Sequence, residues 1–347
     1  MKEKIVWLAK AFVALVVAFC ILSGFCSFYY NLPVHLSNPT KATDYYWEEN
    51  SCSIKATEGF ARVRVDDKGF VNTYEPKGES IDVLVMGSSH TEGFNVGEKE
   101  NYTYLLNEKF SESDDLYFYN IGISGHTFQK CLYNLEAAIN EYNPQKYIVI
   151  EAAYDLLSSE DIDGIQNGTV SYISSNDSGL VYYLQKSNLF RLLYAQFSNV
   201  LKNEALPEFD FKENNDSSEK ADSVSESDEP AEYERKLDAV LKESSELAKN
   251  NGCKLIVAYM TQLEIDYSGT VCDREIKDEV IIFESICEKY DIGFIDLYDS
   301  FADYYEENDT LLQGFSNTKV GVGHINKYGH AVIADELYAY IKGENDK

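Results

Sequence analysis

Two serines and a histidine directly follow an apolar stretch in the first third of the chain. Residues 81–96 read IDVLVMGSSHTEGFNV, and the six residues before Gly87 suit a buried strand. A serine hydroxyl is a weak nucleophile at neutral pH, so it needs a base within hydrogen-bond reach and donors for the oxyanion that forms on attack. A strand-to-helix turn flanked by glycines places a hydroxyl beside the free N–H groups of a starting helix. The stretch is therefore typical of a nucleophilic serine.

Small and polar residues also follow the other apolar stretches that suit strands. Ser124, Gly125 and His126 follow the second stretch, Tyr154 and Asp155 follow the third, and the segment GVGHINKYGH (321–330) lies after the fifth. Ligands of open α/β sheets bind outside the carboxyl ends of the strands, so these segments are expected to gather at one edge. Four of the chain's 5 histidines lie in them: His90, His126, His324 and His330.

The elements that must position these residues alternate between strand and helix. Mostly apolar strands separated by amphipathic helices predict a parallel sheet covered on both faces, here a flavodoxin-like doubly wound α/β fold of about five strands. Strands are predicted over residues 81–86, 116–123, 146–153, 253–260 and 292–298, and helices over 101–110, 127–142, 232–252, 274–290 and 327–342.

The composition excludes one broad class of function. The chain has 347 residues, with 30 basic and 59 acidic side chains and a formal net charge of −29. A nucleic-acid-binding protein needs Lys and Arg in clusters. In this chain such a cluster is found only within the first ten residues. We therefore expect no nucleic-acid partner and interpret the acidity as a soluble, self-repelling surface.

The N-terminus predicts a membrane anchor. Residues 11–30 contain no charge, and as a helix they would rise about 30 Å, one hydrocarbon thickness. Lys2, Lys4 and Lys10 precede this run, so residues 1–10 are expected in the cytoplasm and the rest of the chain outside. A cleaved signal peptide is the alternative, but the apolar run is longer than the usual core of such a peptide.

The rest of the chain divides into a lead segment and one large domain. Residues 31–80 are predicted to contain a hairpin, with its turn at DDKG (66–69), and residues 81–342 to form the α/β domain. An insertion at 156–231 interrupts that domain; it contains an apolar helix at 179–201 and an acidic, Ser-rich tract at 207–231. The tract has almost no aliphatic residues, so we expect it to be disordered.

Three segments resemble the sequence blocks of the SGNH (GDSL-type) hydrolases. GSSHTEG (87–93), NIGISGHT (120–127) and GHINKYGH (323–330) are similar to these blocks and follow one another in the family's order. The resemblance implies that Ser89 is the nucleophile and His324 the general base. It implies oxyanion-hole donors at the backbone of Ser89 and Gly125, with Tyr154 at the position of a further donor, and it implies no metal or other cofactor.

The chain departs from the family pattern at three positions. Ser88 replaces the Asp that usually precedes the nucleophile, Tyr154 replaces the Asn of the third block, and Gly321 replaces the Asp three residues before the base. A Ser–His pair without a carboxylate lacks the group that fixes the imidazole tautomer and stabilises the imidazolium. Three acidic residues could replace it: Asp155, Glu151 and Glu92.

Together, the anchor and the three blocks predict a surface enzyme. The resemblance implies a membrane-anchored extracellular serine esterase or O-acyltransferase that adds or removes acetyl-like groups on a cell-wall polymer or exopolysaccharide. Its expected partners are the carbohydrate polymer or acylated glycan and, for a transferase, a membrane-bound acyl-donor protein. Two alternatives stay open. The first is a degenerate member that binds a glycan or a protein without turnover; the second is a metal-dependent hydrolase using His90, His126 and His324 with Asp155.

Overall fold

The structure of the chain is a computed structural model. It covers the predicted anchor, the lead segment and the α/β domain. It describes residues 2–346 except 32, 56–57, 77, 79, 112–115, 154–155, 172–185, 191–192, 194–229, 267, 273, 275 and 320.

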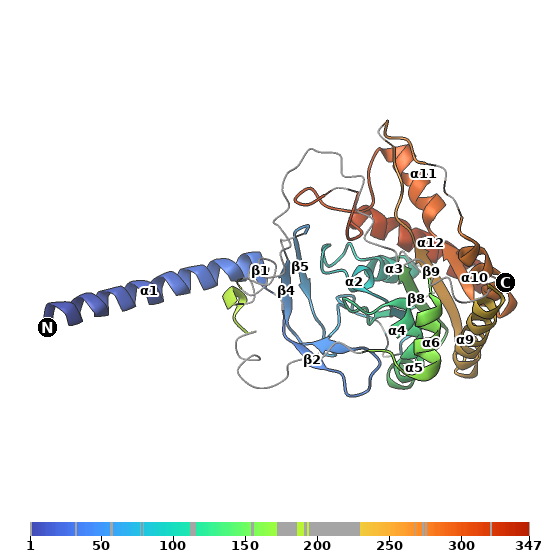
Figure 1. The fold of residues 1–347 in the computed structure, drawn as a ribbon, viewed down its shortest axis with the longest axis horizontal. Coiled ribbons are helices and arrows are strands. Elements are labelled where there is room, and N and C mark those ends of the chain that lie inside the picture. Colours follow the sequence, from blue (N-terminus) through green and yellow to red (C-terminus); the bar gives the residue numbers. More distant parts are fainter. Residues whose placement is uncertain are drawn as a thin grey trace.

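A five-stranded parallel sheet lies at the centre of the protein (Figure 1). The order across the sheet is β7-β6-β8-β9-β10. The strand of this sheet that comes first along the chain, β6, therefore lies between the second, β7, and the third, β8. This is the flavodoxin-like order, with its switch point beside β6. The predicted doubly wound fold is therefore confirmed. The strands are β6 (Val83–Met86), β7 (Phe118–Asn120), β8 (Tyr147–Ala153), β9 (Lys254–Met260) and β10 (Gly293–Asp296).

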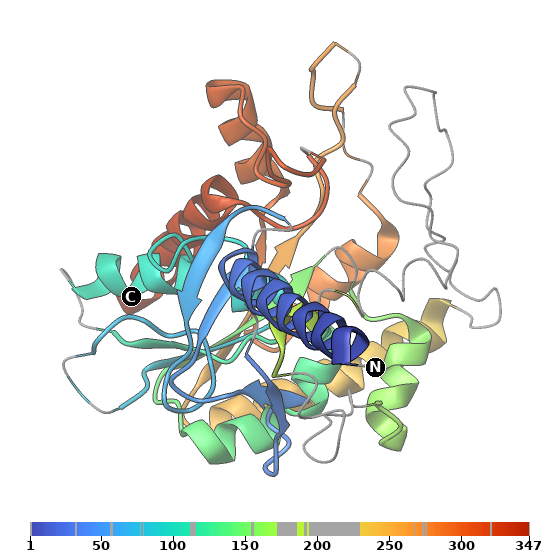
Figure 2. The same cartoon turned by 90° about the vertical axis from the view of Figure 1, so that its left-hand side faces the viewer.

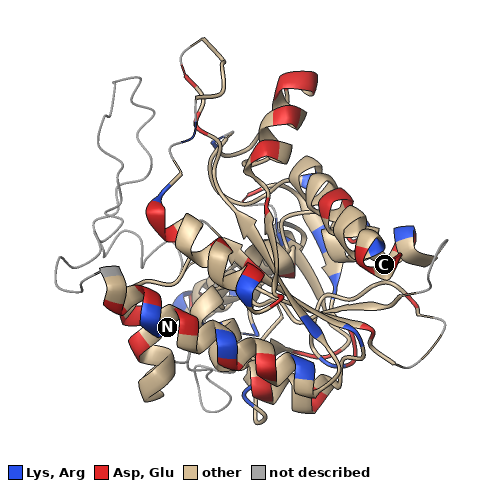
Figure 3. Ribbon diagram, turned by 90° about the vertical axis from the view of Figure 1, so that its right-hand side faces the viewer, with Lys and Arg blue, Asp and Glu red and all other residues tan. Residues whose placement is uncertain are grey.

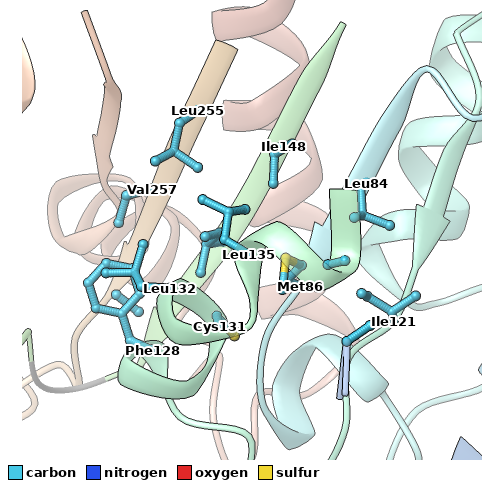
Figure 4. Close-up of a cluster of buried hydrophobic side chains, with 14 of the residues drawn as sticks. Leu84, Met86, Ile121, Phe128, Cys131, Leu132, Leu135, Ile148, Leu255 and Val257 are labelled. Atoms are coloured by element: carbon cyan, nitrogen blue, oxygen red, sulfur yellow. The ribbon is translucent and has the colours of Figure 1, made fainter. Parts of the chain in front are cut away.

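Two apolar clusters cover the two faces of this sheet. Because successive side chains of a strand point to opposite faces, Leu84 and Met86 of β6 belong to one cluster, and Val83 and Val85 belong to the other. Figure 4 shows the first cluster, where β6, β8 and β9 pack against the helix that contains Phe128 and Cys131. That face carries α4 (Phe128–Tyr133), α5 (Leu135–Tyr142), α9 (Pro230–Asn250) and α10 (Asp278–Lys289); the other carries α3 (Tyr102–Ser111), α11 (Tyr298–Asn308) and α12 (Lys327–Asn345).

A long apolar helix precedes the domain. This helix, α1 (Lys2–Tyr29), projects away from the body, and it is long and apolar enough to cross a membrane (Figures 1 and 2). A signal sequence near the N-terminus can also meet these criteria of length and composition. The lead segment forms an antiparallel sheet of β1 (Tyr30–Asn31), β4 (Cys52–Lys55) and β5 (Ala61–Arg64), and a second pair of β2 (His35–Ser37) and β3 (Tyr45–Trp47).

The hairpin predicted for the lead segment is wrong in its pairing. The turn is present, since the backbone N–H groups of Lys68 and Phe70 donate to Asp66 Oδ1, at 2.9 Å each. However, β5 pairs with β4, which precedes it, and not with the residues after the turn. Those residues instead reach the end of β7, where Asn72 Nδ2 donates to the Asn120 carbonyl and the Asn120 N–H donates to Asn72 Oδ1.

Other predicted elements differ in their bounds or lie outside the described part. The helix predicted over 127–142 is divided at Asn134, which ends α4 and precedes α5. The insertion begins with α6 (Ser159–Asn167), a helix not anticipated from the sequence, and α11 was not anticipated either. Most of the apolar stretch 179–201 and the tract 207–229 lie outside the described residues.

On the face seen in Figure 3, Lys and Arg are interspersed with Asp and Glu along the described helices. An ion pair between Lys289 and Asp238 joins α10 to α9. The mixed charges on this face are consistent with the soluble surface expected from the composition.

Candidate functional site

The structure brings Ser89 and His324 together at the carboxyl edge of the sheet. Ser89 begins the short helix α2 (Ser89–Glu92) directly after β6, and His324 lies in the loop that leads into α12. Ser89 Oγ is 2.8 Å from His324 Nε2, an ordinary hydrogen-bond distance, although 235 positions separate the two residues.

The carboxylate beside His324 comes from the lead segment. Glu58 lies between β4 and β5, and its Oε2 is 2.6 Å from His324 Nδ1. Its Oε1 accepts a second hydrogen bond from the His324 backbone N–H, at 2.9 Å. Serine, imidazole and carboxylate therefore form a continuous hydrogen-bonded series. The sequence candidates for this carboxylate did not include Glu58.

Glycines allow the close approach of Glu58. Gly321, at the position of the expected Asp, has φ 84°, and Gly323 has φ 98°, both in the left-handed region that disfavours other residues. A Cβ on Gly323 would lie 2.6 Å from Glu58 Oε1. A second contact joins the segment before Gly321 to the residue after Glu58. The Gly59 N–H donates to Asn317 Oδ1 at 2.8 Å, and Asn317 Nδ2 donates to the Gly59 carbonyl at 3.0 Å. The carboxylate that contacts His324 therefore comes from the lead segment and not from the loop around Gly321.

The ionisation of Glu58 suits it to hold the imidazole. Burial alone would raise the pKa of its carboxyl group, but hydrogen bonds from the ring and the backbone N–H of His324 lower that pKa to about 2. Glu58 is therefore negatively charged at neutral pH. With Nδ1–H donating to Glu58, Nε2 is left as the acceptor for the Ser89 hydroxyl.

Glu151, one of the sequence candidates, fixes the serine turn instead. Its Oε2 accepts from the backbone N–H groups of Ser88 and Thr91, at 3.0 and 2.9 Å, and the hydroxyls of both residues also donate to its carboxylate. A Cβ on Gly87 would lie 2.5 Å from Glu151 Oε2, so the turn closes tightly over this side chain. Ser88, at the family's Asp position, thus ties β6 to β8.

Glu92, the second described candidate, holds the loop after β7. Trp47 Nε1 donates to Glu92 Oε1 at 2.7 Å, and the Ser124 hydroxyl donates to Oε2. The carboxyl group is buried, and burial raises its pKa. Neither Glu151 nor Glu92 is hydrogen-bonded to His324, which corrects that expectation. The third candidate, Asp155, and the predicted donor Tyr154 lie outside the described residues.

The loop that contains Gly125 is fixed by buried charges. Gly125 has φ 82°, and its carbonyl accepts from Lys130 Nζ, at 3.5 Å. Lys130 also forms a buried ion pair with Asp44 of the lead segment, at 2.6 Å. Within the described part of the chain, the backbone N–H groups of Ser89 and Gly125 have no acceptor. Both groups are therefore available to a ligand.

A cavity lies beside the serine turn. Its volume is about 290 Å³, and Ser88 and Glu151 form part of its wall. The remainder of the wall comes from α4, the end of β8 and the start of the insertion, and includes Phe128, Leu156 and Leu157. Neither Ser89 nor His324 is among the residues that line this cavity.

The three remaining histidines that the sequence placed at strand ends are buried and hydrogen-bonded within the protein. His90 Nδ1 accepts from the Ile325 backbone N–H at 3.2 Å, and burial is the main cause that lowers its pKa. His126 Nε2 is 3.1 Å from Asn134 Nδ2, and His330 Nδ1 accepts from the Tyr102 N–H at 3.2 Å. In the described ranges, no three His, Cys, Asp or Glu side chains are placed to hold a metal ion together. The three-histidine zinc site is not formed there.

Buried neutral histidines predict a loss of stability in acid. Burial lowers the pKa of His126 to about 4 and that of His330 to about 3, below the unfolded value of about 6.5. Between these values the unfolded chain binds more protons, so stability falls as pH falls. At pH 5 we expect His126 to contribute about 2 kcal/mol of this loss. Urea unfolding at pH 7 and pH 5 measures it; an equal pH dependence in His126→Gln would contradict the assignment.

The fold and the site define a flavodoxin-like α/β protein with a Ser–His–Glu series at the carboxyl edge of its sheet. No family model matches the chain, and a search of curated proteins finds no match. Solved structures similar to it include those described as an esterase, an acylhydrolase and a GDSL-like lipase.

Three of these structures illustrate the similarity. A psychrotrophic esterase from a Pseudoalteromonas species is 15% identical, covers 76% of this chain and 98% of its own, and has a TM-score of 0.38. A GDSL-like lipase from Parabacteroides merdae is 13% identical, with 78% and 99% covered and a TM-score of 0.38. An acetyl xylan esterase is 13% identical, with 75% and 99% covered and a TM-score of 0.39. At such low similarity, the chemistry of this chain must be judged from its own residues.

Proposed function

We propose that the protein is a membrane-anchored serine esterase or O-acyltransferase that acts on ester-linked acyl groups of a surface carbohydrate. The observation that carries this proposal is the series of hydrogen bonds from the Ser89 hydroxyl through His324 to Glu58, at 2.8 and 2.6 Å. A hydroxyl, an imidazole and a carboxylate in this order are the parts of a general-base-activated nucleophile.

The reaction proceeds through an acyl-serine. Ser89 Oγ attacks the ester carbonyl carbon while His324 Nε2 takes the hydroxyl proton, and a tetrahedral intermediate forms. The N–H groups of Ser89 and Gly125 donate to its oxyanion. When the intermediate collapses, the bond to the leaving alcohol breaks and His324 gives that alcohol its proton. An acceptor hydroxyl then loses its proton to His324 and attacks the acyl-serine. When this second tetrahedral intermediate collapses, the bond between the acyl carbon and Ser89 Oγ breaks and His324 returns the proton to Ser89 Oγ.

Glu58 acts in both halves of this reaction through His324. Its carboxylate holds the Nδ1–H tautomer in the resting enzyme and stabilises the imidazolium after each proton transfer. The neighbouring His90 is kept from adding a second positive charge, because its pKa is lowered mainly by burial.

The nature of the acceptor distinguishes an esterase from a transferase. Water as acceptor gives hydrolysis and a sugar hydroxyl gives acyl transfer, with the same residues in the same roles. The three sequence blocks and the N-terminal helix resemble cell-surface SGNH enzymes that modify polymers, which supports a carbohydrate substrate. Lys2, Lys4 and Lys10 support an orientation with the α/β domain outside the membrane.

Covalent labelling tests the proposal. A fluorophosphonate probe is expected to label the detergent-solubilised full-length protein at Ser89, because the activated hydroxyl attacks phosphorus as it attacks a carbonyl. Ser89→Ala should abolish the labelling found by peptide mass spectrometry. Ser88→Ala should retain it, since the Ser88 hydroxyl bonds to Glu151. If the folded wild-type protein is not labelled, a binding protein without turnover is the better description.

A further inference from the structure

The predicted anchor leads directly into the first strand of the lead segment. Helix α1 ends at Tyr29, β1 begins at Tyr30, and in the β1–β4 pair Tyr30 lies opposite Lys55. Paired Cα atoms lie about 5 Å apart, and the three residues from Lys55 to Glu58 span at most about 11 Å. The Cα atom of Glu58 therefore lies within about 16 Å of the Cα atom of Tyr30, the residue that follows the helix.

The end of the helix is also fixed to the domain. Asn188 Nδ2, from the insertion, is 3.3 Å from Ser27 Oγ of α1 and donates to Asn31 Oδ1 of β1 at 2.9 Å. In Figure 1, α1 leaves the body beside β4, and α2 lies on the same side of the sheet as α1. The distance between the membrane surface and the site is therefore set by packed elements and not by a flexible tether.

Two residues close in sequence to Glu58 and His324 have exposed apolar side chains. Phe60, two residues after Glu58, is 73% exposed, and no other large apolar side chain described outside α1 is more exposed. Val322, two residues before His324, is 40% exposed. An aromatic side chain held close to a bilayer gains by entering the boundary between headgroups and acyl chains.

We propose that the loop carrying Glu58 and Phe60 rests on the lipid surface, so that the site takes acyl esters held in the bilayer in preference to soluble ones. This proposal depends on the membrane anchor and the Ser89 chemistry proposed above. The substrate class is then an ester whose acyl group or alcohol is carried by a lipid. Entry of Phe60 into the headgroup region would hold Glu58 and the hydrogen-bonded Ser89 close to such an ester.

Fluorescence quenching tests the contact independently of activity. The full-length protein is reconstituted in phosphatidylcholine vesicles with brominated acyl chains, using Trp7→Phe as the parent to remove the tryptophan of α1. Phe60→Trp is expected to show a quenched tryptophan signal above that of the parent. Ile281→Trp, at a 54% exposed position on α10, should show none. Equal signals from the two positions would overturn the proposed contact.

Kinetics test the substrate preference. With p-nitrophenyl myristate dissolved in the vesicles, Phe60→Ser should lower the rate about tenfold or more, while the rate with p-nitrophenyl acetate in solution stays within about twofold. Ile281→Ser is the matched control and should change neither rate. Inserting a 14-residue Ala-rich helical segment between Tyr29 and Tyr30 lifts the domain by about 21 Å and should reproduce the selective loss.

The outcomes separate the two proposals. Unchanged myristate hydrolysis in both the Phe60→Ser and the lifted proteins would overturn the inference and leave the serine chemistry standing. If the wild-type protein hydrolyses neither ester but the Phe60→Trp protein shows quenching above its parent, the proposed reaction is wrong and the membrane contact is supported.

Discussion

Ser89→Ala should lower the rate of acyl release from p-nitrophenyl acetate by at least about a thousandfold, because no other group then forms the acyl-enzyme. The change removes one oxygen and leaves the bonds from Ser88 and Thr91 to Glu151 in place. The turn should therefore keep its conformation, and the free energy of unfolding should change little. Steady-state rates at pH 7.5 on the full-length protein measure the loss, with circular dichroism to check the fold.

His324→Ala is the companion variant for this experiment. If Ser89 and His324 act as a unit, the double variant should be no slower than either single variant, because nucleophile and base contribute to the same step. Losses that multiply in the double variant would show that the two residues act separately. A Ser89→Ala protein that retains the wild-type rate would identify another nucleophile.

Glu58→Gln should lower kcat by about three to four orders of magnitude, similar to the loss when an amide replaces the triad carboxylate of a serine protease. The amide has nearly the same shape as the carboxylate, but it cannot stabilise the imidazolium or enforce the Nδ1–H tautomer. The KM for p-nitrophenyl acetate should change much less, because Glu58 contacts His324 and not the substrate. A stopped-flow or steady-state comparison of kcat and KM measures both effects.

Two further variants make the Glu58 prediction specific. Glu58→Asp keeps the charge on a shorter side chain, so it should recover part of the activity that Glu58→Gln loses. Glu49→Gln removes an exposed carboxylate from the same lead segment and should have no effect on kcat. If Glu58→Gln is as active as wild type, the carboxylate is not part of the mechanism, and Asp155 becomes the next candidate.

The positions of the carboxylates explain the departures from the SGNH pattern. Gly321 adopts a left-handed backbone conformation. Three residues later in the same loop, the His324 backbone N–H donates to the side chain of Glu58. At Ser88 the usual acidic side chain is replaced by a hydroxyl that bonds to Glu151 on the adjacent strand. The position three residues before His324 is a glycine, and the carboxylate beside His324 is instead that of Glu58 from a distant segment.

The sequence by itself determined the doubly wound fold and the two residues at the centre of the site. Apolar strands alternating with amphipathic helices predicted the parallel sheet, because periodicity reports local burial. The segments that contain Ser89 and His324 were expected to lie together, because a parallel sheet gathers the carboxyl ends of its strands at one edge. The resemblance to the SGNH blocks then selected these two residues among the serines and histidines of that edge.

Only the tertiary structure decided which carboxylate meets His324. Glu58 belongs to no strand of the central sheet and lies 266 positions from its partner, so no local pattern marks it. Its place depends on the pairing of β4 with β5 and on the hydrogen bonds of Gly59 to Asn317. Contacts between distant segments follow from how finished elements dock, and docking is set by the shapes and hydrogen bonds of both surfaces together.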